Sequence, residues 1–232
     1  MSYISENLEQ VRKNIKAAAE EAGRNPEDIT LIAVTKTYGT DVMNEAIDLG
    51  ACDIGENRVQ EVMEKFENVK PVRWHLIGHL QKNKVKYIID KVELIHSVDS
   101  FDLAKEIDRQ AKKHGKVQNI LLEVNVSGEE SKFGINPDEC EELCRSISAE
   151  FENVKIKGLM TVAPFTDDEE LLIRVFDGMK KLAEDIKEKN IPGVSMDELS
   201  MGMTNDYALA IKHGATMVRV GTGIFGKRDY TK

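Results

Sequence analysis

The sequence has little cysteine and no cysteine spacing that is typical of a zinc site. Cys52, Cys140 and Cys144 are the three cysteines of the 232-residue chain, and no CxxC pair occurs. An odd number argues against a disulfide framework, and no histidine lies near the last two. We therefore expect Cys140 and Cys144, four residues apart in a helix-like segment, to pack in the protein rather than to bind a metal.

Long apolar runs and an excess of basic residues are also lacking. No stretch approaches the about 20 consecutive apolar residues that a membrane-spanning helix needs. The start MSYISENLEQ has neither the basic nor the apolar region of a secretion signal. With 32 Lys and Arg against 41 Asp and Glu, the formal charge of -9 disfavours nucleic acids and anionic membranes as partners. These features predict a cytoplasmic protein.

No Pro/Gly/Ser-rich linker interrupts the chain, and its 41% hydrophobic residues can form one sizeable core. We therefore expect a single domain over residues 1–232. Short apolar runs alternate with amphipathic segments, which is typical of βα repeats with a parallel sheet. The predicted strands are 31–35, 52–55, 72–77, 94–98, 120–126, 156–161, 199–201 and 217–220.

Helix signals lie before and between these strands. An apolar stripe at spacings of four and three predicts a helix ahead of the first strand, and another predicts a long helix over about 172–186. Capping boxes are predicted at Asn136 with Glu139 and at Thr166 with Glu169. Helix stops are predicted at Gly50, Gly115 and Gly214.

Eight strands that alternate with helices fit either a doubly wound sheet or a closed barrel. A dinucleotide-binding sheet would usually show GxGxxG after its first strand, and this sequence has none there. The prediction is therefore an α/β fold of the (β/α)8 TIM barrel type, preceded by an N-terminal helix. In such a barrel the reactive groups lie just past the carboxyl ends of the strands.

The first candidate at these strand ends is Lys36, which follows the apolar run LIAVT directly. Partial burial would lower the pKa of its amine and prepare it for carbonyl chemistry, although most strand-end lysines are simply solvated. Asn57, after the second strand, could bind a ligand or cap the next helix. His79 could line a pocket, but His75 and His79 share no helix face, so a metal pair is not expected.

The last two strands are followed by polar and glycine-rich segments. Ser200 and Met201 lead into Gly-Met-Thr-Asn, which could cradle an anion, or in which Thr204 or Asn205 could cap a helix. Strand period two turns Arg219 toward the barrel interior, where it needs a carboxylate or a ligand atom as acceptor. Gly221 and Thr222 begin a turn that can present backbone N–H groups to a phosphate.

Several strings in order resemble the pyridoxal phosphate homeostasis protein family, and together they span Lys36 to Gly226. They are AVTK, DIGENRVQE, WHLIGHLQKNK, IHSVDS, LLEVNVS, KGLMT, LSMGMTND and VRVGTGIFG. The resemblance implies a barrel like the N-terminal domain of alanine racemase and of ornithine decarboxylase. It also implies that pyridoxal 5′-phosphate (PLP) is held as a Schiff base on Lys36.

The resemblance implies further site residues by motif. Arg219 would face the pyridine nitrogen, a place where a fixed positive charge weakens the cofactor as an electron sink. Three residues would hold the phosphate and three would line the pocket: Ser200, Gly221 and Thr222 for the former, Asn57, His79 and Met201 for the latter.

We therefore expect a carrier that buffers PLP or delivers it to PLP-requiring apoenzymes, as a monomer or weak dimer, rather than an enzyme. Alanine racemases supply a second base, a tyrosine, from a C-terminal domain, whereas this sequence ends soon after the eighth strand, and Tyr230 is too near the end for that role. The alternatives are a PLP-dependent amino-acid racemase or decarboxylase and, more distantly, a Schiff-base aldolase without cofactor.

Overall fold

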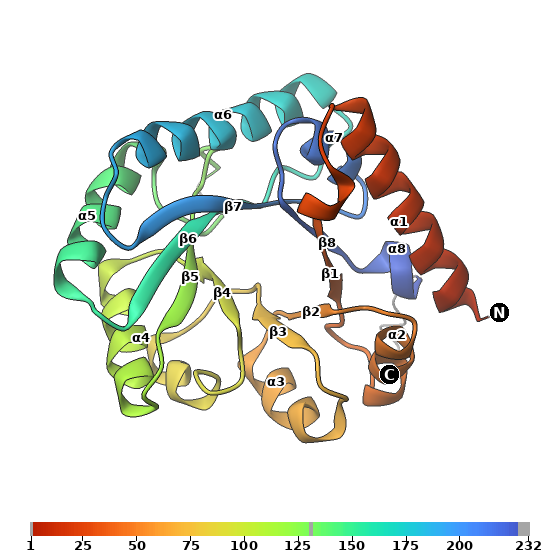
Figure 1. The fold of residues 1–232 in the computed structure, drawn as a ribbon, viewed down its shortest axis with the longest axis horizontal. Coiled ribbons are helices and arrows are strands. Elements are labelled where there is room, and N and C mark those ends of the chain that lie inside the picture. Colours follow the sequence, from red (N-terminus) through yellow and green to blue (C-terminus); the bar gives the residue numbers. More distant parts are fainter. Residues whose placement is uncertain (1, 130–131, 227–232) are drawn as a thin grey trace.

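The computed structural model describes residues 2–129 and 132–226, which form a closed barrel of parallel strands. The strands follow one another around the barrel in chain order, as predicted (Figure 1). They are β1 (Thr30–Val34), β2 (Asp53–Glu56), β3 (Arg73–Leu76), β4 (Leu94–Val98), β5 (Gln118–Glu123), β6 (Val154–Met160), β7 (Val194–Met203) and β8 (Met217–Val220).

Helices surround the strands and cover their outer face (Figure 1). The α-helices are α1 (Tyr3–Glu21), α2 (Thr40–Asp48), α3 (Val59–Lys65), α4 (Phe101–Lys113), α5 (Cys140–Glu150), α6 (Glu169–Glu188), α7 (Tyr207–Lys212) and α8 (Thr222–Phe225). Short 3-10 helices lie at η1 (Pro26–Asp28), η2 (Phe66–Asn68), η3 (Lys82–Tyr87) and η4 (Pro137–Glu139). The predicted TIM barrel is confirmed.

The N-terminal helix α1 is amphipathic and buries the predicted stripe of apolar residues. Its polar face also makes long-range hydrogen bonds: Asn7 donates to the Ile224 carbonyl of α8 at 2.9 Å, and Asn14 donates to the Tyr207 hydroxyl of α7 at 3.0 Å. The helix therefore packs beside the two last helices of the barrel, next to the point where β8 pairs with β1 (Figure 1).

Most of the predicted helix punctuation is confirmed. Gly50, Gly115 and Gly214 have φ angles of 87°, 62° and 106°, which is the left-handed conformation that favours glycine after a helix. Asn136 and Glu139 form the predicted capping box. Cys140 and Cys144 are buried in α5. None of the helices in the described ranges is long and apolar enough to cross a membrane.

The predicted cap at Thr166 is wrong. The Asp168 carboxylate accepts from the Leu171 N–H at 3.0 Å and is the N-cap of α6. Thr166 instead accepts from the Asp168 N–H at 3.1 Å, in the turn before the helix. Two side chains at this site can each accept an N–H, and the one adjacent to the first helical residue takes the cap.

The barrel interior contains a small apolar cluster, separate from the large core between sheet and helices. Its members are Ile32, Leu94, Leu121, Met160 and Met217, all buried. Polar residues lie beside these apolar ones, since Ile32 pairs with Asp53 and Leu94 pairs with His75 in the strand register, which differs from the branched apolar filling that is usual in such barrels. Arg219 pairs with Ile32 in the β1–β8 register and so lies at this level of the interior.

Candidate functional site

A cavity of about 760 Å³ opens at the carboxyl ends of the strands, and we call it the mouth cavity. Five of the eight predicted site residues line it: Lys36, Asn57, Arg219, Gly221 and Thr222. They follow or belong to β1, β2 and β8, which are adjacent in the barrel. The structure thus brings together the lysine, the arginine and the glycine turn.

Lys36 is half-buried and lies between two residues whose positions are fixed by acidic side chains. The Thr35 hydroxyl donates to Glu56 at 2.7 Å, and the Thr37 N–H donates to Glu61 at 2.8 Å. Thr37 has a φ angle of 73°, a left-handed conformation that is uncommon for a β-branched residue. The hydrogen bond from its N–H helps to hold this strained backbone next to the lysine.

Lys65 of α3 joins the two carboxylates. Its Nζ lies 2.9 Å from Glu56, 2.7 Å from Glu61 and 3.2 Å from the Thr35 carbonyl, and its side chain is only 10% exposed. Burial raises the pKa of Glu56 to about 7, although Lys65 and Thr35 oppose the shift. We call Glu56, Glu61 and Lys65 the brace, because the three side chains hold both neighbours of Lys36.

The brace was not predicted from the sequence. A signal was present, since Glu61 and Lys65 are four residues apart at helical spacing and Glu56 directly follows the predicted second strand. Such pairs are common on solvated helix faces, so their spacing alone does not distinguish a buried pair from an exposed one.

Arg219 is almost fully buried and donates three hydrogen bonds to protein oxygen atoms. Its Nη1 lies 2.7 Å from the Ser200 carbonyl and 2.5 Å from the Ser200 hydroxyl, and its Nη2 lies 2.8 Å from the Thr161 carbonyl. The predicted inward orientation is therefore confirmed. Main-chain carbonyls and a hydroxyl accept from the guanidinium, rather than the direct internal carboxylate considered from the sequence.

Burial lowers the pKa of Arg219 to about 10, and the charges of Asp206 and Glu123 oppose the shift. The guanidinium therefore stays charged at neutral pH. Burial likewise raises the pKa of Glu123 to about 7, with a further increase from Asp99 and a decrease from Arg219. One oxygen of Glu123, Oε2, is buried and has no hydrogen-bond partner among residues 2–129 and 132–226.

The turn after β8 directs its donors toward Thr204, which lies in the segment after β7. The Gly221 and Gly223 N–H groups lie 3.3 Å and 3.4 Å from the Thr204 hydroxyl oxygen, and the Thr222 hydroxyl lies 3.3 Å from it. These distances are long for N–H donors, so the bonds are weak. Three weakly held donors at one point are suited to an anionic oxygen.

The alternative capping roles are wrong. Asp206 occupies the N-cap position of α7, so neither Thr204 nor Asn205 caps that helix. Arg58 is at the N-cap position of α3, so Asn57 does not cap it. Asn57 and Thr204 instead line the mouth cavity, which agrees with the ligand-binding alternative.

Three predicted residues, His79, Ser200 and Met201, lie outside the lining of the mouth cavity. His79 is exposed in a separate hollow and stacks on Phe133, with ring centroids 4.2 Å apart. Ser200 and Met201 are fully buried. The Ser200 hydroxyl is engaged by Arg219 and by His96, so its proposed contact with a phosphate remains a prediction.

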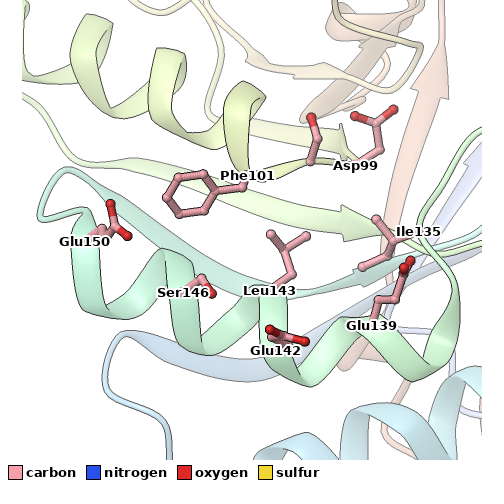
Figure 2. A pocket seen from close by; sticks show the side chains of 9 residues that line it. Asp99, Phe101, Ile135, Glu139, Glu142, Leu143, Ser146 and Glu150 are labelled. Atoms are coloured by element: carbon pink, nitrogen blue, oxygen red, sulfur yellow. The ribbon is translucent and has the colours of Figure 1, made fainter.

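A second hollow of about 470 Å³ lies between α4 and α5, and we call it the acidic groove (Figure 2). Asp99, Glu139, Glu142 and Glu150 line it, together with Phe101 and other residues, and none of its lining residues in the described part of the chain is basic. Four carboxylates would repel a phosphate. The mouth cavity is therefore the candidate site.

Comparisons with known proteins show the family to which the chain belongs. Residues 7–229 match the family described as alanine racemase, N-terminal domain. The pyridoxal phosphate homeostasis protein of Aquifex aeolicus (strain VF5) is 42% identical over 227 residues, which cover 97% of this chain and 98% of the relative.

Two solved structures share the fold of this chain, one at higher and one at lower sequence identity. PipY of Synechococcus elongatus PCC7942, with PLP bound, has a TM-score of 0.84 and 33% identity, covering 96% of this chain and all of PipY. Alanine racemase of Clostridium difficile 630 has a TM-score of 0.76 and 19% identity, covering 97% of this chain but 56% of the racemase, and so shows the fold alone. The chain belongs to the pyridoxal phosphate homeostasis proteins, within the family of the alanine racemase N-terminal domain.

Proposed function

We propose that this protein binds pyridoxal 5′-phosphate in the mouth cavity and holds it for buffering or for delivery to apoenzymes. One observation carries the proposal: an amine, a fixed guanidinium and a turn of N–H and hydroxyl donors meet in one cavity at the ends of adjacent strands. Relatives named for pyridoxal phosphate homeostasis support it.

The donor set fits the chemical groups of this cofactor. Lys36 supplies the amine that binds the aldehyde carbon. The Gly221 and Gly223 N–H groups and the hydroxyls of Thr204 and Thr222 supply donors for the phosphate. Asn57 lines the same cavity and can donate or accept a hydrogen bond.

Arg219 gives the site its bias toward holding rather than using the cofactor. When bound, pyridoxal phosphate can withdraw electrons from an attached amino acid through its ring. Arg219 is charged, buried and held by three hydrogen bonds, so beside the pyridine nitrogen it would disfavour protonation of the ring. A ring without that proton is a weaker electron sink.

The lining of the cavity also supports a carrier over a racemase or decarboxylase. Among the described residues that line it there is no tyrosine, histidine or cysteine to act as a second base opposite Lys36. Its carboxylates are Asp167 and Glu169, which are exposed to water, and Asp206, which accepts from the Met203 N–H at 2.5 Å. Tyr230 lies outside the described residues. Incubation of the purified protein with L- and D-amino acids, followed by chiral analysis, tests this point. Turnover well above that of free PLP would favour the enzyme.

Borohydride trapping tests the proposed attachment. Reduction of the protein with bound PLP, followed by peptide mapping, should place one pyridoxyl group on Lys36. Lys36→Ala should lose this group, whereas Lys132→Ala, which removes a lysine near the mouth, should keep it. A native protein without the modified Lys36 peptide would overturn the proposal, and a cofactor-free aldolase would show no visible absorbance from bound PLP.

A further inference from the structure

A continuous chain of buried polar side chains crosses the barrel interior and ends at Arg219. His75 Nε2 lies 2.9 Å from Asp53 Oδ1, and His75 Nδ1 lies 2.9 Å from His96 Nε2. His96 Nδ1 lies 2.9 Å from the Ser200 hydroxyl, which also accepts from Arg219. All five residues are buried, and His75, His96 and Ser200 are at most 2% exposed.

The donors and acceptors allow one direction of hydrogen bonding along this chain. An ionised Asp53 can only accept, so His75 carries a proton on Nε2, and a neutral His75 ring then accepts at Nδ1. His96 must then carry its proton on Nε2, and its Nδ1 accepts from the Ser200 hydroxyl. The Ser200 oxygen is left to accept from Arg219, so every ring nitrogen and hydroxyl in the chain has a partner.

The charge states of Asp53 and His96 keep this direction of hydrogen bonding fixed. Burial alone would raise the pKa of Asp53, but hydrogen bonds from His75 and Arg73 lower it below its ordinary value. Burial, with a further decrease from the charge of Arg219, lowers the pKa of His96 well below its ordinary value. A carboxylate at one end and a neutral His96 in the middle thus persist at neutral pH.

The chain of hydrogen-bonded side chains runs between the two ends of the barrel. Asp53 begins β2 and forms a bidentate pair with Arg73, the first residue of β3, at 2.6 and 2.7 Å. The Arg73 side chain is 59% exposed, so this end of the chain is close to solvent. The opposite end, Arg219, lines the mouth cavity.

We propose that Asp53, His75 and His96 are positioning residues that set the orientation of the Ser200 hydroxyl and, through it, of Arg219. The guanidinium then presents the same face to the mouth cavity at all times. That Arg219 faces the pyridine nitrogen of PLP there rests on the proposed function. The chain of hydrogen bonds and its direction do not rest on it. With the chain cut, the Ser200 hydroxyl is free to rotate, and Arg219 keeps its two carbonyl acceptors but loses a fixed third one.

Nitrogen-15 NMR of the histidine rings tests the direction of the chain in the protein without PLP. We expect neutral rings with the proton on Nε2 for both His75 and His96. Asp53→Asn, which keeps the shape of the side chain but removes its charge, should give mixed tautomers at both rings, while the exposed His79 and His114 stay unchanged. A proton on Nδ1 of either ring in the native protein, or an unchanged Asp53→Asn, would overturn the proposal.

Absorption spectra and release rates of bound PLP test the link to Arg219. Asp53→Asn and His96→Leu should shift the absorption maximum and speed release by roughly fivefold to tenfold, the effect expected from one lost buried hydrogen bond. The matched control is Ser97→Ala, because Ser97 is the buried neighbour of His96 and bonds to the Gly78 carbonyl outside the chain. It should change neither property.

The two tests separate the possible failures. Altered tautomers in Asp53→Asn with an unchanged spectrum and release rate would refute the positioning role. Failure to trap PLP on Lys36 in the native protein would refute the proposed function and leave the tautomer result intact. If His96→Leu does not fold, Asp53→Asn still decides the outcome.

Discussion

The mouth cavity and the acidic groove are both hollows beside the ends of strands, but they differ in the charged side chains that line them. In the mouth, the cations are Lys36, which is half-buried, and Arg219, which is buried and has fixed partners, whereas the carboxylates Asp167 and Glu169 are exposed. In the groove, Glu139, Glu142 and Glu150 are exposed to water (Figure 2). Fixed charges can bind and orient a ligand, whereas solvated charges of one sign only repel anions.

The largest difference should appear in stability, when a buried charge loses its partner. Lys65→Met leaves Glu56 and Glu61 without their cation in a buried place, which costs about 3–5 kcal/mol. Lys70→Met removes an exposed partner of Asp48 and should cost at most about 1 kcal/mol. Urea unfolding of both variants measures the free energies. Similar values for the two would show that the brace is not held by buried charge.

A carboxylate placed among the phosphate donors should have the next largest effect. We expect Thr222→Glu to weaken PLP binding more than 100-fold, since two like charges in contact cost several kcal/mol. Ser146→Glu adds the same charge to the acidic groove and should leave binding unchanged. Titration with PLP and with pyridoxal distinguishes the cause, because pyridoxal lacks the phosphate. Equal weakening of both ligands by Thr222→Glu would contradict a phosphate site at this turn.

Glu123 should make stability depend on pH. Its pKa is raised from 4.5 to about 7, so the folded protein binds more protons than the unfolded chain between these values. Stability should therefore fall as pH rises from about 4.5 to about 7. Glu123→Gln should remove on the order of 2–3 kcal/mol of that fall. Glu142→Gln in the groove is the control and should keep the pH dependence of the native protein. If Glu123→Gln also kept the pH profile of the native protein, this would contradict burial of the Glu123 charge.

The smallest effect should come from the Thr204 hydroxyl. Thr204→Val keeps the shape of the side chain but removes the oxygen on which three donors meet. We expect about fivefold weaker binding of PLP, the cost of one hydrogen bond, and no change for pyridoxal. Equilibrium dialysis with both ligands measures it. Weaker binding of pyridoxal as well would indicate a general disturbance of the cavity.

The barrel and part of the site follow from local pattern. Apolar runs predicted all eight strands, and only β7 is much longer than expected, at Val194–Met203 instead of 199–201. Its first five residues, VSMDE, mix apolar and polar side chains, so they form no continuous apolar run. The two-residue period of a strand was enough to predict that the Arg219 side chain points into the barrel.

The partners of the site residues could not be read from the sequence. His96 and Ser200 are 104 positions apart, and His75 and Asp53 are 22 apart, so only the closed barrel brings them together. The choice of Asp168 over Thr166 as the cap of α6 likewise depends on backbone geometry that composition does not specify. The sequence shows which side chains are present, but the fold determines which hydrogen-bond partner each of them has.

A crystal structure of the protein soaked with PLP tests the central claim most directly, because it shows both hollows at once. We predict continuous electron density from Lys36 Nζ to the cofactor, its phosphate beside Thr204 and Thr222, and its ring nitrogen toward Arg219. Cofactor density in the acidic groove, or density in the mouth that is not joined to Lys36, would contradict it.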